Sequence, residues 1–178
     1  MAEETDIRVR ALEAREVGDR TDELACLLHA CVHAGASINF VLPFDKADAE
    51  AFWRSKVLPD VERGGRIVQV AEADGRVVGS VQLAIDMPPN QPHRAELNKL
   101  MVHPDHRRRG IARRLMASAE DHARGLGRHL ITLDTRTGDS AEPLYLSLGY
   151  RVVGVIPDYC RDPFVDRLDS TTVMYKTL

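Results

Sequence analysis

Residues 107–112, Arg-Arg-Arg-Gly-Ile-Ala, combine clustered guanidinium groups with a glycine, a combination suited to binding a phosphate group. Before them, the apolar-rich residues 97–102 predict a buried strand and Pro104-Asp105 predicts a turn. After them, apolar residues recur every four positions and predict a helix, at Ile111, Leu115 and Ala119. The first N–H groups of a helix lack intrahelical partners and lie at the positive end of its dipole. The order strand, turn, helix start therefore predicts a pyrophosphate-binding segment, to which Arg113 and Arg114 add charge.

Composition limits what else the chain can be. Its 178 residues predict a single domain, 1–178, with 44% hydrophobic and 29% charged residues, as in ordinary globular proteins. A net charge of −3 argues against a protein built mainly to bind nucleic acid. The acidic N-terminus and the lack of an 18-residue apolar run predict a cytoplasmic protein without a membrane partner. Three cysteines without a CxxC pair predict neither a disulfide framework nor a metal site.

The remaining elements follow from hydrophobic periodicity and turn residues. The first half predicts a strand at 7–12, a helix at 21–33 capped by Thr21 or Asp22, a loop at 33–37, a helix at 45–58, and a hairpin of 66–73 with 76–85 around Asp74-Gly75. The second half predicts a proline-rich loop at 87–92, a strand at 94–102, a helix from 111 to Gly125 or Gly127, a strand at 129–135, a helix at 140–148, and strands at 150–156 and 171–176. An irregular segment with Asp158, Tyr159 and Cys160 is expected between the last two strands. This order predicts a mixed α/β sheet.

Two common phosphate sites are excluded by their patterns, because the chain has neither a G-x-x-x-x-G-K-[ST] loop nor a G-x-G-x-x-G after an early strand. What remains is R-x-x-G-x-A at 107–112, preceded by Val102-His103-Pro104 and followed by SAEPLYLSLGY at 140–150. With this spacing, the chain resembles the GNAT superfamily of acyl-CoA-dependent N-acyltransferases over roughly residues 7–178. The resemblance implies the GNAT fold, a mixed and mostly antiparallel sheet flanked by helices, with splayed central strands. It also implies acetyl-CoA as the co-substrate and no metal.

Further segments resemble the tabtoxin-resistance acetyltransferases of this superfamily, which acetylate an amino group of an amino-acid-like toxin. They are HAGASINF at 33–40, RAELNKLMV at 94–102, LDTRTGDSAE at 133–142, VGVIPDYC at 153–160 and YKTL at 175–178. HAGASINF is the least generic of them, and we expect it to line the acceptor pocket. The predicted substrate-binding residues are His33, Ser37, Asn39, Phe40, Asp158 and Tyr159.

Acetyl transfer to an amine needs a base for the amine proton, a donor for the carbonyl oxygen and an acid for the departing thiolate. By the resemblance, Glu96 and Asp134 lie at matching depths on adjacent strands and accept the proton through water, while Tyr145 protonates the thiolate. The alternatives are a surface ion pair for Glu96, a turn cap for Asp134 and core packing for Tyr145. The resemblance implies that the coenzyme contacts Met101, Val102, Arg107, Arg108, Arg109, Gly110, Ile111, Ala112, Arg113, Ser140 and Tyr145. Of these, Met101 and Val102 are expected to donate through their backbone N–H groups. The chain departs from the family at Gly138, where many members have asparagine, and Asp139 or Ser140 is the expected substitute.

These observations predict an N-acetyltransferase that moves the acetyl group of acetyl-CoA to a small amino-acid-like or antibiotic amine, directly, in a ternary complex. One alternative is acetylation of protein N-termini or lysines, which a wide acidic groove would favour. Another is a CoA-binding sensor without catalysis. A third is a covalent acyl-enzyme on Cys160, although no histidine lies near it in sequence. The expected partners are acetyl-CoA and a small amine, and a homodimer is left open.

Overall fold

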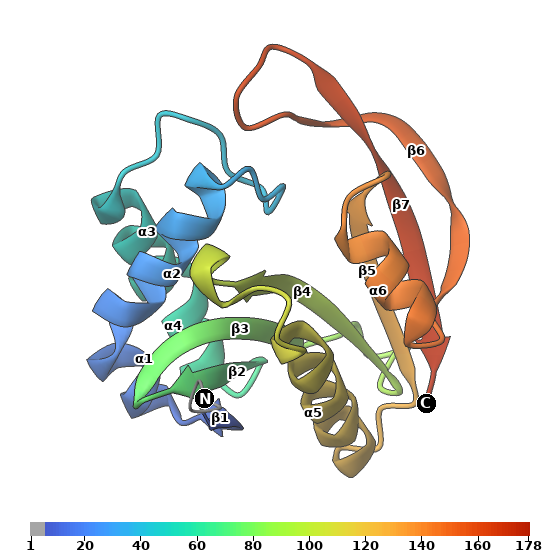
Figure 1. Cartoon of the computed structure of the whole chain (residues 1–178). Coiled ribbons are helices and arrows are strands. Elements are labelled where there is room, and N and C mark those ends of the chain that lie inside the picture. The colour runs from blue at the N-terminus through green and yellow to red at the C-terminus, as the bar shows by residue number, and fades with distance from the viewer. Residues whose placement is uncertain (1–5) are drawn as a thin grey trace.

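Seven strands form one mixed sheet in a computed structural model that describes residues 6–178 (Figure 1). The spatial order is β1-β2-β3-β4-β5-β7-β6. The strands are β1 (Ile7–Leu12), β2 (Arg66–Ala73), β3 (Arg76–Ala84), β4 (Arg94–Val102), β5 (Leu130–Arg136), β6 (Arg151–Arg161) and β7 (Leu168–Thr177). Neighbours are antiparallel except β4 and β5, which run parallel. The predicted sheet, mixed and mostly antiparallel, is confirmed.

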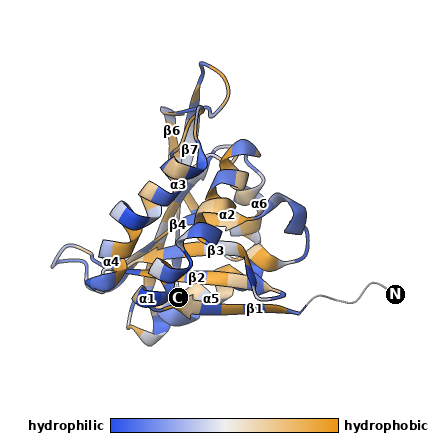
Figure 2. Ribbon diagram, turned by 90° about the vertical axis from the view of Figure 1, so that its left-hand side faces the viewer, coloured by the Kyte–Doolittle hydropathy of each residue, from blue (hydrophilic) through white to orange (hydrophobic). Residues whose placement is uncertain are grey.

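The helices cover both faces of the sheet. One face carries α1 (Ala14–Asp19), α2 (Thr21–His33), α3 (Lys46–Phe52), the π-helical turn η1 (Trp53–Val57) and α4 (Leu58–Glu62). The other carries α5 (Ile111–Gly125), which packs on β1 to β4 through residues that include Leu115 and Met116. The short helices η2 (Pro104–His106) and α6 (Ala141–Ser147) complete the chain. Each face therefore has its own apolar core, and Figure 2 shows the apolar colour along the strands between them.

Gly79 on β3 lets α5 approach the sheet closely. A Cβ added there would lie 3.0 Å from Ile111 Cγ2, 3.0 Å from the Met101 carbonyl oxygen and 3.1 Å from Leu115 Cδ1. Such distances are shorter than most contacts of a real Cβ, so a larger residue would require the helix or the strand to shift by a few tenths of an ångström. The missing side chain thus fixes the position of the helix whose first turn forms part of the site.

Several details differ from the sequence predictions. The helix expected at 45–58 is α3, η1 and α4 in succession and continues to Glu62, with Asp45 accepting a hydrogen bond from the Asp48 N–H at its start. Neither Thr21 nor Asp22 caps α2, because Arg20 holds that position and the Thr21 hydroxyl donates back to Val17 and Gly18 carbonyls. The segment with Asp158, Tyr159 and Cys160 is not irregular but belongs to β6.

The last hairpin is longer than predicted because β6 lies at the sheet edge. An edge strand tolerates Pro157, whose missing N–H would break the ladder in a central strand. The register shifts between Ile156 and Cys160, and Asp158 has a φ of 51°, so a bulge absorbs the irregularity that the sequence suggested. The hairpin of β6 and β7 consequently extends past the rest of the sheet (Figure 1).

The central strands diverge at one point, and this divergence creates the site. β4 and β5 pair from Arg94 with Leu130 to Glu96 with Thr132, and the registered pairing ends there. Beyond it, β4 continues to Val102 and β5 to Arg136.

No helix within residues 6–178 is long and apolar enough to cross a membrane.

Candidate active site

A cavity of about 680 Å³ lies where β4 and β5 diverge. Its walls come from the α2–α3 loop, the end of β4, the first turn of α5, the end of β5, α6 and the hairpin of β6 and β7. A volume of this size fits a small ligand together with one end of a larger one. The predicted residues can therefore be placed by whether they line this cavity.

The predicted phosphate-binding segment forms one wall. Arg108 and Gly110 both have positive φ, 65° and 73°, and Gly110 is the residue from which α5 begins. Backbone with such alternating conformations points successive N–H groups into one concave site suited to an anion. A Cβ added at Gly110 would meet no atom within 4 Å, so the space in front of this backbone is open. All the predicted coenzyme residues except Arg109 line the cavity.

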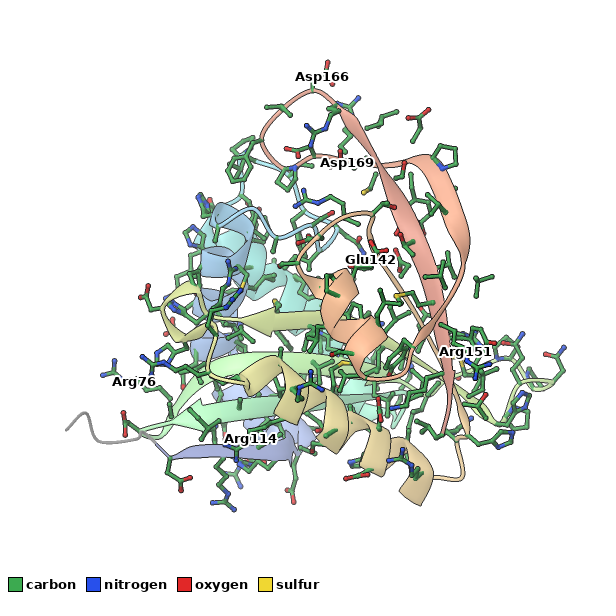
Figure 3. All side chains as sticks on the ribbon, turned by 45° about the vertical axis from the view of Figure 1, so that its right-hand side comes forward. Arg76, Arg114, Glu142, Arg151, Asp166 and Asp169 are labelled. Carbon is green, nitrogen blue, oxygen red and sulfur yellow. The ribbon has the colours of Figure 1, made fainter. Side chains whose placement is uncertain are left out.

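Two arginines near this wall are engaged elsewhere. Arg113 donates to the Ser147 hydroxyl at 2.7 Å and so connects α5 to α6. Arg114, labelled in Figure 3, donates to the Ile7 carbonyl on β1. Arg107, Arg108 and Arg113 of this segment line the cavity, and Arg113 does so while it is bonded to α6.

Tyr145 on α6 faces the cavity and is 7% exposed. Its ring packs edge-on against Tyr150, with centroids 5.8 Å apart. Burial raises the pKa of the Tyr145 phenol above its ordinary value of about 10, and the negative charges of Asp139 and Asp134 raise it further. The phenol therefore keeps its proton at neutral pH, as a proton donor must.

The two predicted carboxylates are not equivalent in the structure. Asp134 lines the cavity and accepts a hydrogen bond of 2.9 Å from the Thr171 hydroxyl on β7. Glu96 does not belong to the cavity wall, and its carboxylate lies 3.2 Å from the Arg94 guanidinium. The expectation of matching depths is wrong, because Glu96 pairs with Thr132 and Asp134 lies two residues farther along β5. Asp134 is the carboxylate that the structure places in the cavity.

The N–H of Val102 points to the open edge of β4. The next N–H, of His103, donates to the Val78 carbonyl beside β3 at 2.9 Å. Successive N–H groups of a strand point to opposite edges, so the Val102 N–H faces the side that β5 has left. The Val102 carbonyl on the same edge accepts hydrogen bonds from Arg107 Nε at 3.3 Å and Cys31 Sγ at 3.5 Å.

The acceptor side of the cavity is only partly as predicted. Ser37, Asn39 and Tyr159 line it. His33, Phe40 and Asp158 are not part of its wall, and His33 Nε2 lies 2.8 Å from the Phe44 carbonyl oxygen, a contact that supports the fold.

The α2–α3 loop and the hairpin of β6 and β7 meet above the cavity. The Leu42 N–H donates to the Pro163 carbonyl at 3.1 Å. Arg136 at the end of β5 donates to the Gly35 carbonyl at 3.3 Å and forms ion pairs with Asp139, Asp162 and Asp169 at 3.3, 3.5 and 3.6 Å. Figure 3 places Asp169 on β7 and Asp166 at the outer turn of the hairpin. The α2–α3 loop and the hairpin are therefore connected to each other on one side of the cavity.

Comparison with known proteins identifies the fold and the family. Residues 36–150 match the family described as Acetyltransferase (GNAT) family. The chain belongs to this family. The predicted membership of the GNAT superfamily is thereby confirmed.

Individual relatives agree with this assignment. The chain is 39% identical over 92 residues to human N-acetyltransferase 8, a match that covers 51% of this chain and 40% of that protein. The matched region thus spans about two fifths of that relative. A ribosomal-protein-alanine N-acetyltransferase from Brucella melitensis superimposes with a TM-score of 0.76 and 24% identity, covering 96% of this chain and 99% of the other. A putative acetyltransferase from Salmonella typhimurium, solved with acetyl-CoA, superimposes with a TM-score of 0.74 and 22% identity, covering 98% and 95%.

Gly138, where many GNAT members have asparagine, and Cys160, the possible nucleophile, both lie close to the cavity. Gly138 has a φ of 78° and its N–H donates to the Glu142 carboxylate at 2.8 Å, whereas the neighbouring Asp139 and Ser140 line the cavity. Cys160 also lines the cavity, with its Sγ 3.8 Å from the Ser37 hydroxyl and 3.9 Å from the Asp169 carbonyl oxygen. Neither neighbour is a base that could activate a thiol.

Sequence reasoning missed several residues that line this GNAT cavity, and the one with the clearest chemical potential is Lys99 on β4. It lines the cavity and has a φ of 54°. Its only signal in the sequence was a lysine inside the apolar-rich residues 97–102, which by itself does not reveal its direction. As for metals, no cluster of three or more potential ligands occurs in the described part of the chain.

Proposed function

We propose that this GNAT enzyme transfers the acetyl group of acetyl-CoA to the amine of a small amino-acid-like substrate, which includes antibiotics and toxins of that kind. One observation supports it above the others: Gly110, Tyr145, Asp134 and the acceptor-side residues Ser37 and Asn39 line one and the same cavity. The coenzyme arm and a small amine would therefore meet within it.

The chemistry follows from the positions of these groups. The amine nitrogen attacks the thioester carbonyl carbon, a C–N bond forms, and the carbonyl oxygen gains charge that the Val102 N–H would stabilise. Asp134 would accept the amine proton through water. When the C–S bond breaks, the Tyr145 hydroxyl would protonate the sulfur to give free CoA. Glu96, held by Arg94, remains a predicted second proton acceptor farther from the cavity.

The connection between the α2–α3 loop and the β6–β7 hairpin supports a small acceptor over a protein. Contacts from Leu42 to Pro163 and from Arg136 to Gly35 would narrow the space for a polypeptide on that side of the cavity. The resemblance to tabtoxin-resistance acetyltransferases supports an amino-acid-like acceptor as well. Acetylation of protein N-termini or lysines is the main alternative, and a CoA-binding sensor without catalysis is the second. A role in resistance and a cytoplasmic location belong to the proposal.

The test is thiol release from acetyl-CoA with a panel of amino acids, aminoglycosides, β-lactam amino-acid analogues and short peptides with free N-termini or lysines. We expect release with a small amino-acid-like amine and little release with the peptides. Release confined to the peptides would replace this proposal with protein acetylation. Tight binding of acetyl-CoA without release from any amine would indicate a CoA-binding module.

The order of the two substrates can be tested in the same assay. Direct transfer in a ternary complex predicts initial-rate lines that intersect when both substrates are varied, and a Cys160→Ala variant that retains its rate. A covalent intermediate on Cys160 predicts parallel lines and a dead variant. We expect the former, because the Cys160 sulfur contacts only a hydroxyl and a carbonyl in its hydrogen-bonding neighbourhood.

A further inference from the structure

A bulge in β4 moves Lys99 to the acceptor side of the sheet. Asn98 pairs with Gln82 and Met101 pairs with Ser80, so β4 has one residue more than β3 between these pairs. Before the bulge, Leu97 belongs to the core on the α5 face; after it, Met101 belongs to the core on the α2 face. A bulge changes which face a strand presents. Without it, Lys99 would follow Leu97 and point at α5.

The ammonium group of Lys99 lies beside two aromatic rings, and no carboxylate of the described chain neutralises its charge. Its Nζ lies 5.8 Å from the centroid of the Phe40 ring and 5.9 Å from that of Phe52. The pKa of Lys99 is lowered to about 8, mainly by burial and also by the Arg66 charge, with the Asp134 charge acting in the opposite direction. No carboxylate within residues 6–178 lies within ion-pair distance of Lys99.

Two other half-buried cations of the described chain have a carboxylate partner, and half-buried Arg128 donates to the carbonyl oxygens of Pro92, Arg94 and Ile85, whereas no partner of either kind is found for Lys99. Lys176 lies 2.6 Å from the Glu120 carboxylate, and Arg66 lies 2.9 Å from that of Asp60. Removing a cation from water without a counter-ion is unfavourable, and two aromatic rings compensate for only part of the cost. A half-buried lysine that lines a cavity and forms no ion pair with a carboxylate is therefore suited to bind an anion that enters the cavity.

The charges on either side of the cavity match a zwitterion. Asp134 supplies a negative charge on β5 and Lys99 a positive charge on β4. We propose that Lys99 binds the carboxylate of the acceptor, and that the acceptor is an amino acid or close analogue with a free carboxylate. This inference rests on the proposed function and narrows it to one substrate class. In it, Lys99 determines specificity, whereas Tyr145 and Asp134 act on the reacting atoms.

The experiment compares amino acids with their primary carboxamides as acceptors, using glycine and glycinamide, L-alanine and L-alaninamide, and L-lysine and L-lysinamide. We measure kcat/KM for each acid and its amide with wild type and Lys99→Met. Because a hydrogen bond to a charged group is strong, we expect the acid-to-amide ratio to fall about tenfold or more in the variant. The variant should act on the amides nearly as wild type does. Comparing the ratio between variants cancels the different basicity of the acid and amide amines.

Two further variants separate binding of the carboxylate from other effects. Lys99→Arg keeps the charge and should restore part of the preference for acids. Lys56→Met removes an exposed lysine on η1, outside the cavity, and should leave the ratio unchanged. An unchanged ratio in Lys99→Met, or an equal loss for acids and amides, would overturn the proposal and assign Lys99 to packing or to the amine.

The failure of this inference is distinguishable from failure of the proposed function. If no amine of the panel releases thiol, the same pairs are compared for binding to the protein saturated with CoA, by calorimetry. Tighter binding of an acid than of its amide in wild type, lost in Lys99→Met, would still support the carboxylate site. Equal affinity for acid and amide, or no binding of either, would refute it.

Discussion

The two sides of the cavity are built in different ways. The coenzyme side comes from one continuous stretch, from the end of β4 through η2 to the first turn of α5. The acceptor side is assembled from distant segments: the α2–α3 loop, the β4 bulge at Lys99, Asp134 on β5, and Tyr159 on β6. A local stretch carries its function in its own backbone conformation, whereas an assembled surface depends on strand pairing and on the fit between segments.

The two sides also differ in what they offer a ligand. The coenzyme side presents backbone N–H groups around Arg108 and Gly110, whose positive φ values create the concave site. The acceptor side presents side-chain charges of opposite sign, Lys99 and Asp134. Substitutions on the first side should therefore change coenzyme affinity for every acceptor, and those on the second should change the choice of acceptor.

The largest effect should come from Tyr145, which lies where the two sides meet. Tyr145→Phe keeps the ring and its packing but removes the proton donor to the leaving sulfur. We expect kcat to fall about 100-fold, a typical contribution of a general acid, with the affinity for acetyl-CoA nearly unchanged. Steady-state thiol release and coenzyme titration measure the two quantities.

Tyr150→Phe is the matched control for that change. Its ring packs edge-on against Tyr145 and is buried to a similar degree, but it is not part of the cavity wall. We expect its kcat to stay close to that of wild type. A kcat for Tyr145→Phe within about threefold of wild type would remove Tyr145 from the role of acid and leave it as a packing residue.

A smaller effect, confined to the coenzyme side, should follow from Gly110→Ala. The residue has a φ of 73°, so alanine adds strain of roughly 1 kcal/mol and places a methyl group in the open space before the N–H groups. We expect the Kd for acetyl-CoA to rise about tenfold, with no change in the ranking of acceptors.

Gly127→Ala separates strain from coenzyme contact. Gly127 follows the other end of α5, has a φ of 69°, and also has open space around it. Both variants should lose a similar amount of stability in urea unfolding, but Gly127→Ala should bind acetyl-CoA as wild type does. Equal affinities in the two variants would mean that the backbone at Gly110 does not face the coenzyme.

The sequence predicted the coenzyme side of the cavity better than the acceptor side. The hairpin around Asp74-Gly75, the strand at 94–102 and the helix start after Gly110 were predicted correctly, because each depends on neighbouring residues whose conformational preferences agree. On the acceptor side, Ser37, Asn39 and Tyr159 were correctly predicted to line the cavity, but His33, Phe40 and Asp158 do not.

The acceptor side was harder to predict because its geometry comes from pairing between strands. Lys99 faces the cavity only because β4 has an extra residue opposite β3, and nothing within residues 97–102 encodes that shift. Glu96 and Asp134 were expected at equal depth, but the parallel register offsets them by two residues. The segment with Asp158, Tyr159 and Cys160 was expected to be irregular, yet it belongs to the edge strand β6, which also accommodates Pro157.

The smallest predicted effect concerns stability and tests whether Lys99 is kept at a cost to the fold. Its folded-state pKa of about 8 is lower than the value of about 10.4 expected in the unfolded chain, so the unfolded chain binds more protons between these two pH values. The free energy of unfolding should therefore rise with pH across this window. Below about pH 8, the protein carries the full free-energy cost of burying the charged Lys99 ammonium. The charges that face Lys99 are those of Arg66 on β2 and Asp134 on β5.

Lys99→Met should accordingly stabilise the protein free of substrates. The contacts of the ammonium with the Phe40 and Phe52 rings offset part of the cost of burying the Lys99 charge. We therefore expect Lys99→Met to raise the free energy of unfolding by about 1 kcal/mol at pH 7. The gain should shrink towards pH 9.5, where wild-type Lys99 has lost its proton in the folded state. Urea unfolding at both pH values measures it, with Lys56→Met as the exposed control. A variant less stable than wild type at pH 7 would show that Lys99 supports the fold through its two rings, and that its place in the cavity does not reflect selection for an anionic substrate.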